Sequence, residues 1–258
     1  GCTATSNLAI TQNPPAPTAG ITNNSGSAVL NCTLNTISLT ATGGASYAWS
    51  GGLGNTANAS VSNVSNITVT VTAANGCTAT SNLAITQNTT APNAGITNNS
   101  GTSTLTCSQA SISLTASGGS SYVWSGGLGN TANATATASG NYTVTVTGSN
   151  GCSATASLAI TQNTTAPTAG ITNNSGSTVL TCSQNSIGLT ATGGATYAWS
   201  GSLGSNANAS VTLPGVYVVT VTAANGCKSN ATITITQNTT APNAGITNNS
   251  GSAVLNCT

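Results

Sequence analysis

The sequence contains almost no charge. None of its 258 residues is Asp, Glu, His, Arg or Met, and Lys228 is the only formally charged side chain. An average domain carries about 25% charged residues, so pairs of oppositely charged side chains are excluded from this fold. Hydrophobic residues nevertheless make up 38% of the chain, which separates it from disordered sequences, where low hydrophobicity accompanies high net charge.

These absences exclude several classes of function. General acid–base catalysis draws on His, Asp, Glu and Lys, and with Lys228 alone we expect no enzyme. Calcium and magnesium sites depend on carboxylates, and the 30- and 45-residue cysteine spacings match no compact zinc pattern, so we expect no metal or other cofactor. The lack of a basic patch argues against a nucleic-acid partner. No apolar run approaches the length of a membrane span.

What the sequence does contain is internal repetition with a constant step of 75 residues. A Gly-Cys pair recurs at Gly1-Cys2, Gly76-Cys77, Gly151-Cys152 and Gly226-Cys227, and a second cysteine series consists of Cys32, Cys107, Cys182 and Cys257. Neither series contains an insertion or deletion. The period exceeds the 20 to 50 residues of solenoid repeats, so it predicts small self-contained domains in series.

Short proline-containing stretches at 13–17, 88–92, 163–167 and 238–242 are the predicted linkers, because proline fixes φ and stiffens such connections. We therefore expect domains at 14–88, 89–163 and 164–238. Residues 1–13 would be the last strand of a preceding domain, and 239–258 the start of a following one. Together these end segments lack the middle of a domain. Because the chain also opens without a Met or a signal peptide, we interpret it as part of a longer array.

Within one copy, segments of alternating polarity predict about seven short strands. Residues 37–41 and 67–72 alternate apolar and polar side chains, the period of a half-buried strand. Asn75-Gly76 is a strong hairpin signal, after which the chain returns through 78–86. No segment shows a helical period. The predicted fold class is therefore all-β, with tandem antiparallel Ig-like β-sandwiches of about 75 residues.

Aromatic residues make up only 3% of the chain and recur in register. We interpret Trp49, Trp124 and Trp199 as core anchors, the alternative being a sugar-stacking surface. Tyr142 and Tyr217 open the equivalent strand in two copies, and we expect a tyrosine-corner role for them rather than a role in ligand binding.

The cysteines predict disulfides, since small domains with thin cores commonly rely on them and such bonds persist in oxidising, extracytoplasmic settings. Pairing within a domain would give Cys32–Cys77, Cys107–Cys152 and Cys182–Cys227, leaving Cys2 and Cys257 with partners outside this sequence. However, a Cys before the second strand and one after the sixth can lie at opposite ends of a seven-strand sandwich. Bridges between neighbouring copies, such as Cys2–Cys32, therefore remain an alternative.

Several motifs together resemble a known class of repeat. They are 178–191, the Tyr-Ala-Trp-Ser motif that begins at Tyr197, 140–147 and 150–152. This combination resembles the Ig-like and PKD-like repeats of giant secreted surface adhesins of Bacteroidota, in the style of gliding-motility adhesins. The resemblance implies export to the surface of a Gram-negative cell by the type IX route. Two departures are Ile67, which stands where the other copies have Tyr142 and Tyr217, and the complete lack of acidic residues.

Two functional hypotheses follow. In the first, the repeats are the extracellular, disulfide-stapled spacer of a long surface stalk or adhesin, whose partners are the neighbouring repeats of the same chain. In the second, the chain is a subunit that binds other copies of itself in an extracellular filament or sheath. Near-identical copies favour the spacer, because no copy is distinguished as a binding site.

Overall fold

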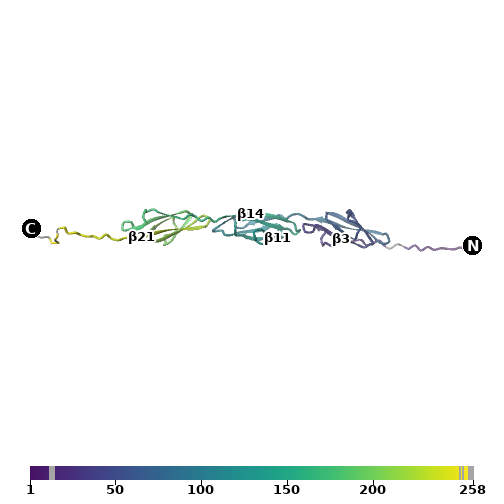
Figure 1. The fold of residues 1–258 in the computed structure, drawn as a ribbon. Coiled ribbons are helices and arrows are strands. Elements are labelled where there is room, and N and C mark those ends of the chain that lie inside the picture. The colour runs from purple at the N-terminus through teal and green to yellow at the C-terminus, as the bar shows by residue number, and fades with distance from the viewer. Residues whose placement is uncertain (12–14, 250, 252, 255–258) are drawn as a thin grey trace. The chain divides into compact units, whose positions relative to one another are not determined.

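The computed structural model of the protein describes residues 1–11, 15–249, 251, 253 and 254. Figure 1 shows the strands that make up the fold. Throughout the described residues there is no α-helix, and Ser50–Gly52 forms the one 3-10 turn. No described helix is thus long and apolar enough to cross a membrane. The predicted all-β, Ig-like sandwich class is confirmed.

By its internal contacts the chain divides into two compact units. The first comprises Gly1–Ser103, Ile112–Ala136 and Gly140–Ile160, and the second comprises Thr104–Ser111, Thr137–Ser139 and Thr161–Thr258. The middle sequence copy contributes to both units. The domain bounds 14–88, 89–163 and 164–238 stay a prediction, and below "copy" refers to these three stretches of sequence.

The first copy forms two sheets that recur in the others. One has the strand order β1-β3-β5 and the other β2-β7-β6-β4. All pairs are antiparallel except β2 with β7, which is parallel. The strands are β1 (Gly20–Asn23), β2 (Val29–Leu30), β3 (Ile37–Thr42), β4 (Ser46–Trp49), β5 (Asn58–Val61), β6 (Ser65–Thr72) and β7 (Thr78–Gln87).

The second and third copies repeat this topology. Their sheet orders are β12-β10-β8 with β11-β13-β14-β9, and β15-β17-β19 with β16-β21-β20-β18. The second copy contains β8 (Gly95–Asn98), β9 (Thr104–Thr106), β10 (Ile112–Ser117), β11 (Ser121–Trp124), β12 (Asn133–Ala136), β13 (Gly140–Thr147) and β14 (Ser153–Asn163). The third contains β15 (Gly170–Asn173), β16 (Val179–Thr181), β17 (Ile187–Thr192), β18 (Thr196–Trp199), β19 (Asn208–Val211), β20 (Gly215–Thr222) and β21 (Lys228–Asn238).

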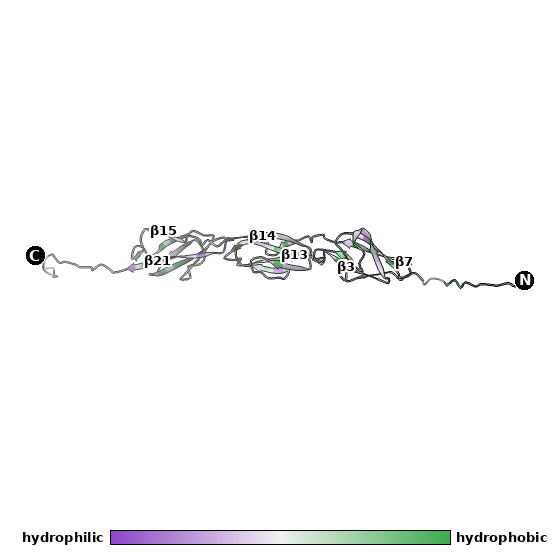
Figure 2. Ribbon diagram, turned by 45° about the vertical axis from the view of Figure 1, so that its right-hand side comes forward, coloured by the Kyte–Doolittle hydropathy of each residue, from purple (hydrophilic) through white to green (hydrophobic). Residues whose placement is uncertain are grey.

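The cores follow from the alternation of side chains along the strands. In β3, Ile37 and Leu39 are fully buried, and in β6 Val69 and Val71 are fully buried, while the alternate serine and threonine residues of these strands face the other side. Figure 2 shows hydrophobic residues along β3 and β7. β-Branched threonine suits the outer face of such strands, so the sandwiches form with almost no charged residues on their surface.

The three tryptophans lie inside the cores. Trp49 is 6% exposed and its Nε1–H donates to the Thr56 carbonyl at 2.9 Å. The equivalent Trp124 and Trp199 are 4% and 7% exposed and donate to the carbonyls of Thr131 and Asn206. A buried indole with its only donor satisfied has no face available for a sugar ring, so the structure favours the anchor role.

The two tyrosines open strand β13 and its equivalent β20. Tyr142 is 8% exposed. The Tyr217 hydroxyl donates to the carbonyl of Leu213, four residues upstream, at 2.9 Å, the kind of backbone bond that a tyrosine corner makes. In the first copy Ile67 occupies this position and is 2% exposed, so an aliphatic side chain fills the same part of the core.

The assignment of the end segments 1–13 and 239–258 to neighbouring domains stays a prediction. Of 1–13 the structure describes residues 1–11, which form no strand, and the described part of 239–258 contains no strand either. The reason lies in the pairing: β7, β14 and β21 each pair with strands of their own copy. A final strand without its copy therefore has no sheet to join.

Candidate functional site at the junction between copies

The cysteines connect consecutive copies. Cys32 is bonded to Cys152 and Cys107 to Cys227, each pair 120 residues apart in sequence with a Cα–Cα distance of 5.0 Å. The predicted pairs Cys32–Cys77, Cys107–Cys152 and Cys182–Cys227 are therefore wrong, because each contains a cysteine that is bonded elsewhere. Each observed bond lies within one compact unit.

Strand geometry explains why pairing within a copy fails. Cys32 follows β2, whose Leu30 is paired with Gln87 at the end of β7, whereas Cys77 precedes the start of β7 at Thr78. β7 has ten residues, and at about 3.3 Å per residue it separates the two cysteines by roughly 30 Å. A disulfide needs Cα atoms about 4.4 to 6.8 Å apart, so the partner of Cys32 has to come from another copy.

The alternative, a disulfide between neighbouring copies, agrees with the structure, but the pair Cys2–Cys32 given as its example does not form. Cys32 pairs with Cys152 of the following copy and not with Cys2, which is exposed. Cys182 is also exposed and forms no disulfide, whereas Cys77 is half-buried. Cys257 lies outside the described residues.

The first junction is a hairpin of the second copy seated on a loop of the first. The Gly148 N–H donates to the Cys152 carbonyl at 2.8 Å, which closes the hairpin, and the Cys32 N–H donates to the Asn150 carbonyl at 3.3 Å. Gly151 has φ +75° and lies so close to Thr33 that an added Cβ would be 2.4 Å from its Cγ2. Glycine is therefore required both for the turn and for the approach of the two copies.

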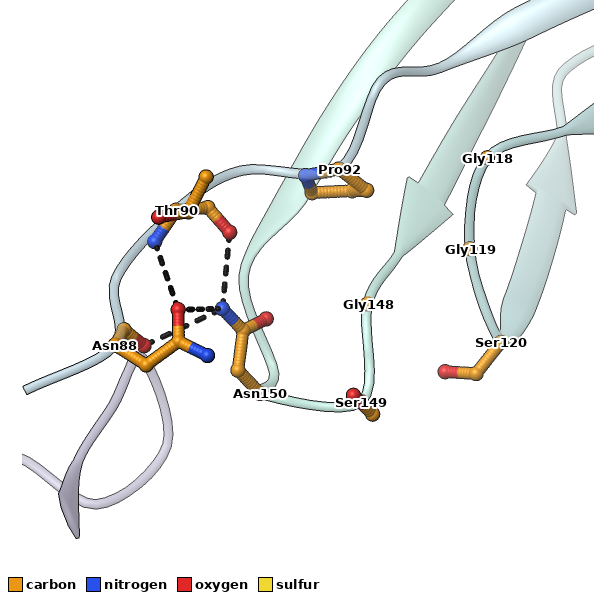
Figure 3. Close-up of a pocket in the computed structure, with 9 residues that line it drawn as sticks. All are labelled: Asn88, Thr90, Pro92, Gly118, Gly119, Ser120, Gly148, Ser149 and Asn150. Carbon is orange, nitrogen blue, oxygen red and sulfur yellow. Dashed lines mark hydrogen bonds between the residues drawn. The ribbon is translucent and has the colours of Figure 1, made fainter.

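One asparagine side chain holds the linker. The Asn150 Nδ2 group donates to the Asn88 carbonyl at 3.3 Å, to Asn88 Oδ1 at 3.1 Å and to the Thr90 carbonyl at 2.9 Å, as Figure 3 shows. Its Oδ1 accepts from the Cys152 N–H at 3.2 Å. We call this arrangement the asparagine clamp. It ties the linker to the hairpin that carries the disulfide.

The clamp borders a shallow hollow of about 500 Å³. Figure 3 shows its lining, which consists of amide, hydroxyl, glycine and proline residues. A Cβ at Gly118 would be 1.9 Å from the Asn93 carbonyl oxygen, so the chain turns tightly here. The lining offers no acid, base or thiol for chemistry and no aromatic ring for stacking. The lining residues are Asn88, Thr90, Pro92, Gly118, Gly119, Ser120, Gly148, Ser149 and Asn150.

The second junction reproduces the first with the equivalent residues of the next two copies. The Cys107 N–H donates to the Asn225 carbonyl at 3.1 Å. The Asn225 Nδ2 group donates to the Asn163 carbonyl, to Asn163 Oδ1 and to the Thr165 carbonyl at 3.3, 3.0 and 2.9 Å. Cys227 is 2% exposed, as Cys152 is 3% exposed. Two independent instances show that the junction is a property of the repeat.

Sequence reasoning identified the cysteines but missed the clamp. Of the three equivalent asparagines only Asn75 is predicted as a turn residue, in the Asn75-Gly76 hairpin, while Asn88 and Asn163 lie in the predicted linkers. The available signal was that these asparagines repeat at the constant step while neighbouring positions vary, for example Pro15 against Thr90. No short-range pattern indicates that residues 62 positions apart meet.

The clamp gives a first testable prediction. In Asn150→Asp a carboxylate replaces the amide donor and faces three oxygen acceptors, so we expect a loss of about 1–3 kcal/mol of stability at neutral pH. These acceptors raise the pKa of the new carboxyl in the folded state. The loss of stability is therefore absent below the pKa that this carboxyl has in the unfolded chain. It develops as the pH rises through the higher pKa of the folded state.

Thermal unfolding from acid to neutral pH measures this effect. Asn141→Asp is the matched control, because Asn141 is exposed on β13. Equal stability of the two variants at neutral pH would show that the clamp contributes nothing.

No protein-family model and no curated protein matches this sequence. Similar solved structures include one described as "Structural insight into host cell surface retention of a 1.5-MDa bacterial ice-binding adhesin", with a TM-score of 0.48, 17% identity, and coverage of 88% of this chain and 100% of that one. The fibronectin(III)-like modules of Clostridium thermocellum CbhA match with a TM-score of 0.27, 13% identity, and coverage of 55% and 95%. Extracellular cadherin domains 1–4 of protocadherin gamma B7 match with a TM-score of 0.23, 11% identity, and coverage of 86% and 72%.

The strand topology and the junctions define the class of this protein as a tandem array of Ig-like β-sandwich repeats. In the part of the chain that the structure describes, no three His, Cys, Asp or Glu residues gather into a metal-binding group. The distinctive groups of the array are the junction cysteines and asparagines.

Proposed function

We propose that this chain is the structural spacer region of an extracellular stalk or adhesin, in which each copy is cross-linked to the next. The observation that carries the proposal is the disulfide between consecutive copies, formed twice at the same positions. Domains in one chain ordinarily move relative to each other unless their interface is large. A disulfide and an asparagine clamp at each junction restrict that motion, which suits a part that maintains a distance.

The location outside the cell is supported by the same bonds, because disulfides form and persist in oxidising compartments. A non-enzymatic role is supported by the near-absence of charged side chains. Export by the type IX route from a Gram-negative cell of the Bacteroidota, and membership of the PKD-like type, rest on the sequence resemblance alone.

Surface display tests the spacer. The chain is placed between a cell-surface anchor and a fluorescent tip, and the height of the tip is compared for arrays of increasing copy number. We expect a constant increment of height per copy. A height that does not change with copy number would contradict the proposal.

The composition predicts stability that is insensitive to pH and salt. With no Asp, Glu or His, folding changes the protonation of almost no group between about pH 4 and pH 8, and screening has no ion pairs to weaken. We expect an unfolding midpoint that is nearly flat over this range, measured by calorimetry. A shift of many degrees would show that ionisable groups contribute after all.

A subunit of a self-assembling filament or sheath is the second candidate. The observation that favours it is that the chain carries almost no charged side chains, and charges on edge strands are what ordinarily block pairing between strands of different molecules.

A further inference from the structure

We propose that the first copy binds a small phenol beside Ile67, where the other two copies hold a tyrosine ring of their own. The site is a hollow of about 120 Å³, which we call the Ile67 hollow, and it lies wholly within the first compact unit. The inference goes beyond the spacer and filament proposals, and its test leaves both untouched. It distinguishes one copy of an otherwise uniform array as a binding site.

The third copy shows where the ring belongs. A Cβ added at Gly201 would be 3.3 Å from Cε1 of Tyr217, and one added at Gly215 would be 3.8 Å from its Cε2. The Tyr217 hydroxyl donates to the Leu213 carbonyl at 2.9 Å. Three backbone positions therefore border the ring, one at each edge and one at the hydroxyl.

The second copy places its ring in the same way. A Cβ added at Gly126 would be 3.1 Å from Cε1 of Tyr142, and one added at Gly140 would be 3.9 Å from its Cε2. Two copies thus show that the backbone of the repeat accommodates an aromatic ring at this place.

In the first copy the same three positions line the Ile67 hollow. At the constant step they are Gly51, Ser65 and Asn63. Among the described residues, a Cβ added at Gly51 would meet no atom within 4 Å, whereas at the two equivalent glycines it would meet the ring. Because isoleucine is shorter than tyrosine, Ile67 fills the inner part of this place and leaves the outer part open.

The lining suits a neutral ring with one hydroxyl. Val61 and Ile67 are 3% and 2% exposed, and Leu53 packs against the same core, so the floor of the hollow is apolar. An aliphatic cavity of about 150 Å³ binds benzene. The Asn63 carbonyl occupies the position of the Leu213 carbonyl and can accept a hydrogen bond from the phenol. None of the lining residues is charged, which favours the uncharged ligand.

Phenol itself is the probe, added to the full oxidised chain with isotope-labelled Val and Ile methyl groups. We expect the methyl resonances of Val61 and Ile67 to shift and to saturate with a dissociation constant on the order of 1 mM. Val211, the equivalent of Val61 in the third copy, should not shift, because Tyr217 fills that place. Equal shifts at Val61 and Val211, or no saturable shift at Val61 at any soluble phenol concentration, would overturn the proposal.

Substitution of Ile67 tests the vacancy directly. Ile67→Tyr gives the first copy the residue of the other two, so its own ring should occupy the Ile67 hollow and the response of Val61 to phenol should be lost. Ile67→Val is the matched control, because an aliphatic side chain leaves the hollow open and should bind phenol with similar affinity. Binding that persists in Ile67→Tyr, or that is lost equally in Ile67→Val, would overturn the proposal.

A pair of glycine variants tests the position of the bound ring. Asn tolerates the φ of +66° at Gly51 and of +73° at Gly52. The side chain of Gly51→Asn begins at the edge of the ring, so phenol should bind at least about tenfold more weakly. Gly52→Asn should leave the affinity unchanged, since the third copy carries Ser202 at the equivalent position with φ +61°. Equal phenol affinity in the two variants would overturn this placement of the ligand.

Discussion

Reduction of the two disulfides should allow the chain to be stretched to more than twice its oxidised length. In the oxidised protein the shortest covalent route from end to end runs to Cys32, crosses to Cys152, returns to Cys107 and crosses to Cys227. That route contains about 107 residues, or roughly 370 Å when fully extended, against about 900 Å for the reduced chain. Single-molecule force spectroscopy with and without reductant measures both limits.

The pattern of bonds is tested by a matched variant. In the structure Cys182 belongs to neither bond, so Cys182→Ser should leave the oxidised limit unchanged. If the bonds instead joined Cys32–Cys77, Cys107–Cys152 and Cys182–Cys227, the same substitution would open one of them and add about 45 residues, or roughly 150 Å. An increase of that size would contradict the connectivity between copies.

Removal of one junction disulfide should be the most damaging change to stability. Each bond closes a separation of 120 residues, and a disulfide typically contributes about 2–4 kcal/mol. In Cys32→Ser/Cys152→Ser we expect the unfolding midpoint to fall by on the order of 10 °C. The double substitution avoids a free thiol at the buried Cys152 position, and calorimetry of the oxidised protein measures the change.

Cys182→Ser is again the control, with an expected change close to zero because this thiol is exposed. If the double variant and the control unfold at the same temperature, the junction bond does not stabilise the copies. The bond would then affect only the maximum extension of the chain.

The fold could be predicted because its determinants are local. Alternation in 37–41 and 67–72 places Ile37, Leu39, Val69 and Val71 on one face, and the structure buries them. The Asn75-Gly76 turn and the constant 75-residue step required no knowledge of distant contacts. The prediction of a sandwich needed only the strand period and the fact that each hydrophobic face must be covered.

The junction could not be predicted in the same way. The sequence places Cys77 45 residues after Cys32 and Cys152 120 residues after it, and separation along the chain favours the shorter loop. What separates the nearer pair is the parallel pairing of β2 with the end of β7, a long-range contact that no local pattern encodes.

The sequence alone therefore determined an all-β array, its period, its core positions, its near-absence of charged side chains and its supply of regularly spaced cysteines. Only the tertiary structure decided which cysteines meet and which asparagine holds the linker. The physical reason is that β7 is roughly 30 Å long, so its first and last residues lie at opposite ends of the copy. Cys32 at one end is therefore met by the hairpin of the next copy, where Gly151 lets the two backbones approach.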